Sequence, residues 1–284
     1  MVANSPSTRK RFWTARRITD LSCGSILALL AFLGLFPYLV ALIVSFKDDM
    51  QYAQSAWLPT LPLHFENWSN AWNQINIYWV NSFIVAAAVT LALLVLSSIA
   101  GFVFARYDFP GNGLLFFLII IMFAVPSVIN LVPLFILVRN LHMIDTLWAL
   151  IVPYTVGSLY ISVYLMRNSI RAINDELFEA ARIDGSSGPQ MYWFIVLPLS
   201  IPIMGTVVMT QLTNVWNEYL WAFLVINDSS KRTIGTGLQF FTNEQTTSFG
   251  PLFAGYILAS VPLLIAFTFL SRYFVAGIQA GTSK

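Results

Sequence analysis

The chain has 284 residues, of which 57% are hydrophobic and only 10% are charged, and its mean hydropathy is +0.72. Soluble domains carry about 25% charged residues, so this composition indicates a membrane protein. A net charge of +2 is too small to argue for a nucleic-acid partner. The single cysteine, Cys23, excludes an internal disulfide, and we expect it to be a small buried hydrophobe.

Six uncharged runs are each long enough to cross a bilayer as a helix, which takes about 20 residues. They are Leu21–Phe46, Val80–Ala105, Leu114–Val138, Thr146–Met166, Trp193–Asn217 and Pro251–Ser271. We therefore predict an all-α polytopic membrane protein with six transmembrane helices. The first run is too long for a signal-peptide core and ends without a cleavage pattern, so we expect an uncleaved span.

The basic residues predict the orientation of these spans. With the N-terminus in the cytoplasm, 11 of the 15 basic residues fall on the cytoplasmic side. The other four are Lys47, Arg139, Lys231 and Arg232. Basic residues are enriched in cytoplasmic segments, so both termini and the loop between the fourth and fifth spans are expected to be cytoplasmic.

The first exterior segment, residues 47–79, is rich in tryptophan and interrupted by Pro59 and Pro62. We expect its tryptophans to form an interfacial belt rather than a binding site, and Phe65–Gln74 could form a short helix on the membrane surface. The second, Asn227–Gly250, is polar and contains several turn signals.

Two prolines are expected to kink the third span. Pro126 and Pro133 bracket Asn130, and kinks there would free backbone carbonyls that need partners or a wet cavity. Such kinks favour a transporter, although they are common in membrane proteins, and they make Asn130 a candidate for a solute pathway.

The stretch Glu179–Pro198, which we call the EAA loop, interrupts the apolar runs with a polar sequence. Asn174 or Asp175 can cap a short helix with an acidic first turn, and Gly185 can end it in a left-handed conformation. We predict a helix over Asp175–Asp184. Ala180 and Ala181 would leave its surface shallow, so that a partner protein could approach the backbone closely.

The fifth span carries the densest polar face in the sequence. Thr206, Thr210, Asn214 and Asn217 follow one another at helical spacing, and Gln211 and Glu218 overlap that face. Polar groups in a membrane face a cavity or bond to neighbouring helices, and both readings stay open. Glu218 could also be solvated at the outer boundary. Hydroxyls and amides near Trp216, Tyr219 and Trp221 favour a neutral, hydroxyl-rich solute.

Several kinds of chemistry are absent from the sequence. None of the four lysines follows a glycine, so there is no P-loop for nucleotide phosphates. His64 and His142 lie far apart, and no cysteine–histidine cluster suggests a metal site. No span holds paired carboxylates, which argues against an ion-coupled carrier, and no Ser/His/Asp set suggests an enzyme.

The EAA loop resembles the loop through which permease subunits of binding-protein-dependent ABC importers contact a separate ATPase. The residues that carry the resemblance are Glu179, Ala180, Ala181, Gly185, Ile195, Leu197 and Pro198. Further likeness to maltose-type sugar permeases lies in Asn81-Ser82, Ala105-Arg106-Tyr107, Trp216-Asn217-Glu218 and the glycine-rich tail.

This resemblance implies a type I ABC importer permease, with a basic N-terminal segment (1–20) and a peripheral first span (21–46). A five-helix core (80–271) would follow, with a coupling loop at about 171–192 and a cytoplasmic tail (272–284). Glu179, Ala180, Ala181, Asp184 and Gly185 would meet the ATPase. Gly277, Gln279 and Gly281 of the tail would reach into the ATPase dimer, unless the terminus is frayed.

The resemblance also implies partners and a location. A homologous second permease, two ATPase subunits that bind ATP and Mg, and an extracytoplasmic solute-binding protein would complete a complex in a prokaryotic cell membrane. This chain would hold no cofactor. A di- or oligosaccharide is the expected solute; glycerol phosphate and, further off, an ion-coupled secondary transporter remain as alternatives.

Overall fold

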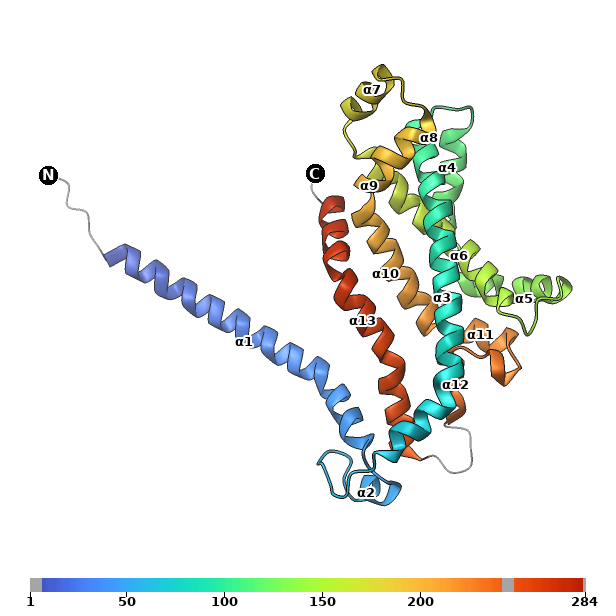
Figure 1. Ribbon diagram of the computed structural model, residues 1–284. Coiled ribbons are helices and arrows are strands. Elements are labelled where there is room, and N and C mark those ends of the chain that lie inside the picture. Colours follow the sequence, from blue (N-terminus) through green and yellow to red (C-terminus); the bar gives the residue numbers. More distant parts are fainter. Residues whose placement is uncertain (1–6, 242–247, 283–284) are drawn as a thin grey trace. The chain divides into compact units, whose positions relative to one another are not determined.

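The computed structural model describes residues 7–241 and 248–282, and every regular element within those ranges is a helix (Figure 1). The described residues form two compact units. One takes its residues from 7–71 and 248–257, and the other from 72–241 and 258–282. The all-α prediction is confirmed.

The first unit contains α1 (Ser7–Val44), α2 (Asp49–Gln54) and the first turns of α3 (Glu66–Arg106) and α13 (Phe249–Thr282). Every side chain of α1 from 20 to 39 is exposed, although this stretch is strongly apolar. Cys23 is therefore exposed and the expectation of a buried cysteine is wrong, because this part of α1 makes no core with the rest of its own unit.

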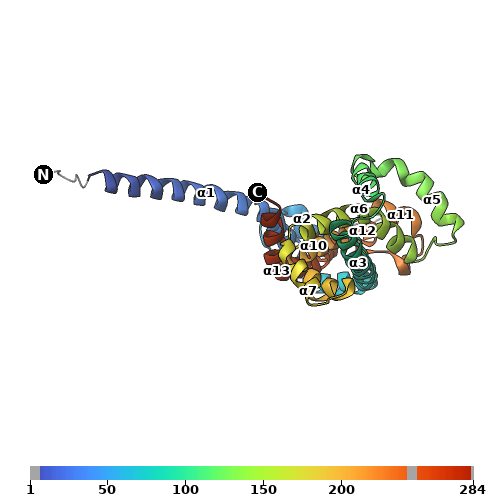
Figure 2. The ribbon, with the colours of Figure 1, turned by 90° about the horizontal axis from the view of Figure 1, so that it is seen from above.

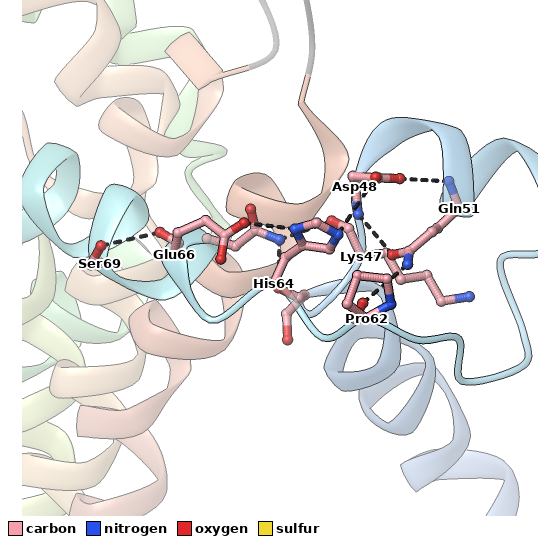
Figure 3. Close-up of polar contacts among 9 residues, drawn as sticks. Lys47, Asp48, Gln51, Pro62, His64, Glu66 and Ser69 are labelled. Atoms are coloured by element: carbon pink, nitrogen blue, oxygen red, sulfur yellow. Dashed lines mark hydrogen bonds and ion pairs between the residues drawn. The ribbon is translucent and has the colours of Figure 1, made fainter.

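The segment between α1 and α3 is held together by polar contacts (Figure 3). The Lys47 side chain is buried, and its ammonium donates to the carbonyls of Ser55 and Leu58, which lowers the cost of removing the charge from water. Burial lowers the pKa of Lys47. The His64 ring lies with Nδ1 2.6 Å from a Glu66 oxygen and Nε2 3.5 Å from an Asp48 oxygen.

The second unit is built from the remaining helices and from the later residues of α3 and α13. They are α4 (Asn112–Ile121), η1 (Met122–Ala124), η2 (Ser127–Asn130), α5 (Leu131–Asn140), α6 (Trp148–Arg171), α7 (Asp175–Ile183), α8 (Gly188–Met191), η3 (Tyr192–Val196), α9 (Leu197–Leu199), α10 (Ile201–Asn217), α11 (Leu220–Val225), η4 (Ser229–Lys231) and α12 (Ile234–Phe241).

Among the described residues, four helices are long and apolar enough to cross a membrane, and two bent pairs would each add one span. The six predicted spans correspond to these six features. The third span is bent by 91° between Ala124 and Val128, around Pro126, and Figure 2 shows α5 turning away from α4 there. The fifth is bent by 70° at Ser200, between Pro198 and Pro202. Proline explains both breaks, since it removes a backbone donor.

The structure places the start of the second span differently from the sequence expectation, and it extends the last helix. Residues 66–74 do not form a separate surface helix but the first turns of α3, because no proline or glycine interrupts the chain between Pro62 and Gly101. At the other end, α13 continues through the predicted tail to Thr282. Each glycine costs a helix only about 1 kcal/mol relative to alanine, which the preceding turns can offset.

The core of the second unit consists of three apolar clusters. The largest joins α3, α5, α6, α10 and α11 around Leu93, Leu150 and Val225. A second, at the α7 end, gathers Phe102, Met166 and Phe178. The third packs α3, α10, α12 and α13 around Ile75 and Trp216. α6 and α10 pack against each other, so the polar face predicted for the fifth span belongs to a helix at the centre of this unit (Figure 1).

Candidate functional site

The predicted helix at the start of the EAA loop is confirmed as α7, one residue shorter than expected. Asn174 caps it by accepting from Glu176 N at 3.2 Å, and two acidic residues occupy the first turn. At its end Gly185 N donates to Arg182 O and Ser186 N donates to Ala181 O. Gly185 has a φ of +79°, which an L side chain rarely adopts, so glycine is required for this turn.

One face of α7 is buried and the opposite face is open. Phe178 is buried in the cluster with Met166 and Ile170, and Ala181 packs at its edge. Glu179, Ala180, Asp184 and Gly185 are exposed. Ile183 is 86% exposed. An exposed isoleucine beside alanine and acidic groups is suited to contact with another protein.

Sequence reasoning missed Ile183. It lies four residues after Glu179 and three after Ala180, a spacing that puts all three on one helical face. Helical register was therefore the signal that could have identified it.

The six residues proposed for a solute pathway lie in different environments. Asn130, Asn214 and Asn217 are exposed, and Thr210 is half-buried. Gln211 is fully buried, and its Oε1 has no hydrogen-bond donor among the described residues. Asn217 Nδ2 donates to Thr213 O at 2.8 Å within its own helix. The exposed amides of Asn130 and Asn214 need partners outside this chain, either protein or a wet passage.

Glu218 has partners within the chain. Its carboxylate accepts from Trp221 N at 2.8 Å, from Ala222 N at 3.2 Å and from the hydroxyl of Tyr154 on α6. These bonds cap α11 immediately after α10 ends at Asn217. Glu218 thus supports the break between the two helices.

Two of the tryptophans that the sequence places near the polar face of the fifth span, as support for a hydroxyl-rich solute, have structural roles instead. Trp216 and Trp221 are each 5% exposed. Their indole N–H groups donate to Ala259 O and Ala149 O at 3.0 and 2.8 Å. A buried indole needs such an acceptor, and here the acceptors lie on α13 and α6. Neither ring is therefore open to a solute, which corrects the sequence-based expectation.

Residues 227–234, which follow α11, are held by a hydrogen-bond network near the N-terminal end of α6, the end away from α7. Asn81 Nδ2 donates to Ser230 O and Arg232 O at 2.8 and 3.0 Å, and Ile234 N donates to Ser82 Oγ at 2.7 Å. The carboxylate of Asp145 accepts from Asp228 N at 2.9 Å. That bond is the main cause that lowers the pKa of Asp145 below its usual value.

The tail residues Gly277, Gln279 and Gly281 lie in the last turns of α13, where side chains are outside the described part of the chain. Residues 242–247 of the predicted Asn227–Gly250 segment also lie outside it. Among the described residues, no group of three or more His, Cys, Asp and Glu side chains could hold a metal ion.

Comparison with known proteins identifies relatives over nearly the whole chain. Residues 94–280 match the family described as binding-protein-dependent transport system inner membrane component. The chain is 33% identical over 252 residues to the probable ABC transporter permease protein YurM of Bacillus subtilis, covering 88% of this chain and 83% of that protein.

Two further relatives carry more specific names. The arabinooligosaccharides transport system permease protein AraQ of Halalkalibacterium halodurans is 30% identical, with 90% of this chain and 94% of that protein covered. The sn-glycerol-3-phosphate transport system permease protein UgpE of Yersinia pestis is 29% identical, with 93% and 97% covered.

The fold also matches a solved structure. A chain of a bacterial ABC transporter involved in the import of the acidic polysaccharide alginate aligns with a TM-score of 0.80 at 18% identity. The alignment covers 96% of this chain and 100% of that chain. At this identity the match establishes the fold alone.

Proposed function

Because the chain belongs to the binding-protein-dependent transport system inner membrane component family, we propose that it is the permease subunit of an ATP-driven importer for a di- or oligosaccharide. The observation that supports this most directly is the open face of α7, where Glu179, Ala180 and Ile183 are exposed and no described residue buries them. It is a transport subunit, and ATP hydrolysis is carried by a partner.

The open face of α7 meets the ATPase. The sequence holds no P-loop, so the energy of transport enters through other polypeptides that bind ATP and Mg, two copies in the full complex. Their closure displaces α7, and the packing of Phe178 in the cluster with Met166 and Ile170 passes that displacement to the spans.

The solute passes along α10, between this chain and a homologous second permease. Thr210, Asn214 and Asn217 present hydroxyl and amide groups on the accessible side of that helix. Such groups make directional hydrogen bonds to sugar hydroxyls and carry no charge that would hold an ion.

Glycerol phosphate is a second candidate solute because UgpE is among the relatives. A phosphate calls for an arginine or lysine in the passage. The Arg167 guanidinium lies 3.7 Å over the Phe116 ring, and its Nε donates to Phe104 O, so it is held by its own chain. This favours the neutral sugar.

The protein spans the membrane several times, with both termini and α7 in the cytoplasm. An extracytoplasmic solute-binding protein delivers the sugar at the opposite side, where the network around Asn81 and Asp145 holds residues 227–234 in place.

Co-purification with an affinity tag on this chain tests the proposal. Extraction in mild detergent should recover an ATPase and a second permease. Glu179→Lys should abolish ATPase recovery and sugar uptake, since it reverses a charge on the docking face. Asp108→Lys is the matched control: it makes the same charge change at an exposed position in the loop after α3.

Two outcomes would contradict the proposal. One is uptake that persists without ATP and follows an ion gradient, as in a secondary transporter. The other is full uptake and full ATPase recovery with Glu179→Lys.

A further inference from the structure

The side chain of Arg106 lies where α3, α6 and α7 meet. Arg106 is the last residue of α3, and its side chain is only 11% exposed. The guanidinium donates to Ile170 O at 2.7 Å and to Ile173 O, and it forms an ion pair with Asp175, the first residue of α7. Its carbon lies 4.0 Å above the centre of the Phe178 ring.

These partners come from both sides of a helix junction. Ile170 lies in the last turn of α6 and Ile173 in the turn that follows, at the negative end of the helix dipole; Ile170 O also accepts from Ile173 N at 3.2 Å. Asp175 and Phe178 belong to α7. One cationic group from α3 thus holds the end of α6 and the beginning of α7 together.

The end of α3 is itself fixed to α6. At Gly101 the two backbones approach so closely that a Cβ would lie 2.8 Å from Met166 Cβ and 2.9 Å from Arg167 N. Phe102 is buried beside Met166 and Phe178. A displacement of α7 would therefore move the end of α3 through close contacts. These contacts include the guanidinium of Arg106.

We propose that Arg106 is the positioning residue that transmits the movement of α7 to α3, so that ATP hydrolysis and solute transport stay coupled. This role rests on the proposed function, in which α7 contacts the ATPase. Arg106 does not lie on the open face of α7; it acts behind that face, between the docking helix and the spans.

The chemistry of arginine suits this role. Its planar guanidinium carries five donors in a fixed fork, so that it can hold two carbonyls and one carboxylate at once. A lysine would keep the charge but concentrate it at one atom. Arg106→Lys should accordingly retain part of the coupling, and Arg106→Gln should lose most of it.

The test uses the complete complex, reconstituted in lipid, with three readouts: ATPase recovered with the tagged chain, rate of ATP hydrolysis, and solute moved per ATP. For Arg106→Gln we expect unchanged ATPase recovery and hydrolysis within about twofold of wild type. Solute moved per ATP should fall about tenfold, within the range of typical coupling energies. Arg139→Gln is the control, because the side chain of this exposed arginine at the end of α5 forms no hydrogen bond or ion pair with any described residue.

Asp175→Asn provides an independent variant, since its side chain is 80% exposed and its loss should leave folding intact. It should lower solute per ATP less than Arg106→Gln does, and the double variant should be no worse than Arg106→Gln alone, because both remove one interaction. If the Arg106→Gln protein does not accumulate in the membrane, the solute moved per ATP by Asp175→Asn tests the coupling role instead.

Three results separate the possibilities. An unchanged ratio of solute to ATP in Asp175→Asn and Arg106→Gln overturns the proposal. A parallel loss of ATPase recovery, hydrolysis and transport also overturns it, because Arg106 would then only maintain the fold. If the wild-type chain itself recovers no ATPase, the proposed function fails instead.

Discussion

Glu218 illustrates how a carboxylate can be retained in a membrane-spanning region for a structural reason. α10 ends at Asn217, the backbone of Glu218 is extended, and α11 begins at Leu220. Such a break leaves N–H groups without intrahelical partners, which is costly in hydrocarbon. The Glu218 carboxylate accepts from two of them and from Tyr154, so a single side chain offsets most of that cost.

We predict that Glu218→Ala destabilises the chain by about 1–3 kcal/mol, because it leaves buried donors without an acceptor. The thermal unfolding midpoint of the purified full-length chain in detergent should fall measurably, with no solute or partner present.

Asn217→Ala is the control for this prediction. Asn217 is exposed, and its side-chain bond to Thr213 O lies within its own helix, so its loss should change stability by less than about 0.5 kcal/mol. If the two variants lower the midpoint equally, or if Glu218→Ala leaves it unchanged, the capping role is wrong.

At the level of elements, the contact between α3 and α6 depends on one glycine. Alanine normally stabilises a helix interior by about 1 kcal/mol over glycine. At Gly101 the added methyl would meet the backbone of Met166 and Arg167, which cannot rotate away. Gly101→Ala should therefore destabilise the chain by about 1–3 kcal/mol, the usual cost of overpacking, and the same unfolding measurement reads it out.

Gly157→Ala on α6 provides the matched comparison. Apart from the adjoining turns of α6 itself, no described atom would lie within 4 Å of a Cβ at this position, so the substitution should be neutral or stabilising. Equal effects at both glycines would show that the close approach of α3 to α6 does not govern stability.

Elements defined by local signals could be predicted from the sequence, and those defined by distant contacts could not. Asn174 and Gly185 are the local signals for the ends of α7: the predicted start at Asp175 was correct, and the predicted end at Asp184 was one residue too late. Apolar runs located the four long apolar helices and both bent pairs. The sharp angle at Ser200 and the unbroken start of α3 were missed, since proline predicts a break but not its geometry, and the composition of residues 66–74 suits either a surface helix or a longer one.

The candidate site divides in the same way. The open face of α7 follows from helical periodicity, and only Ile183 was overlooked. The polar face of α10 could be predicted from the helical spacing of its polar residues. The roles of those residues could not, because they depend on contacts with residues far along the chain. Trp216 bonds to Ala259 and Glu218 to Tyr154, pairings that no local pattern encodes.

At the level of the whole molecule, α6 separates α7 at one end from Asp145 and its partners at the other. It has 24 residues, which at 1.5 Å per residue makes about 36 Å, enough to cross a hydrocarbon layer of about 30 Å. α7 follows its C-terminus within four residues, and Asp145 precedes its N-terminus by three. We therefore predict that the open face of α7 and the 227–234 segment bound to Asp145 lie on opposite sides of the membrane.

Cysteine labelling measures this directly, because Cys23 is the one cysteine of the chain and Cys23→Ser gives a background free of thiols. Ser229→Cys and Arg182→Cys each place a thiol at an exposed position, one beside each end of α6. A membrane-impermeant maleimide should label Ser229→Cys in intact spheroplasts and Arg182→Cys only after the membrane is opened. The reverse pattern would place α7 outside the cell, where no ATPase could reach it, and labelling of both in intact spheroplasts would show that α6 does not cross the membrane.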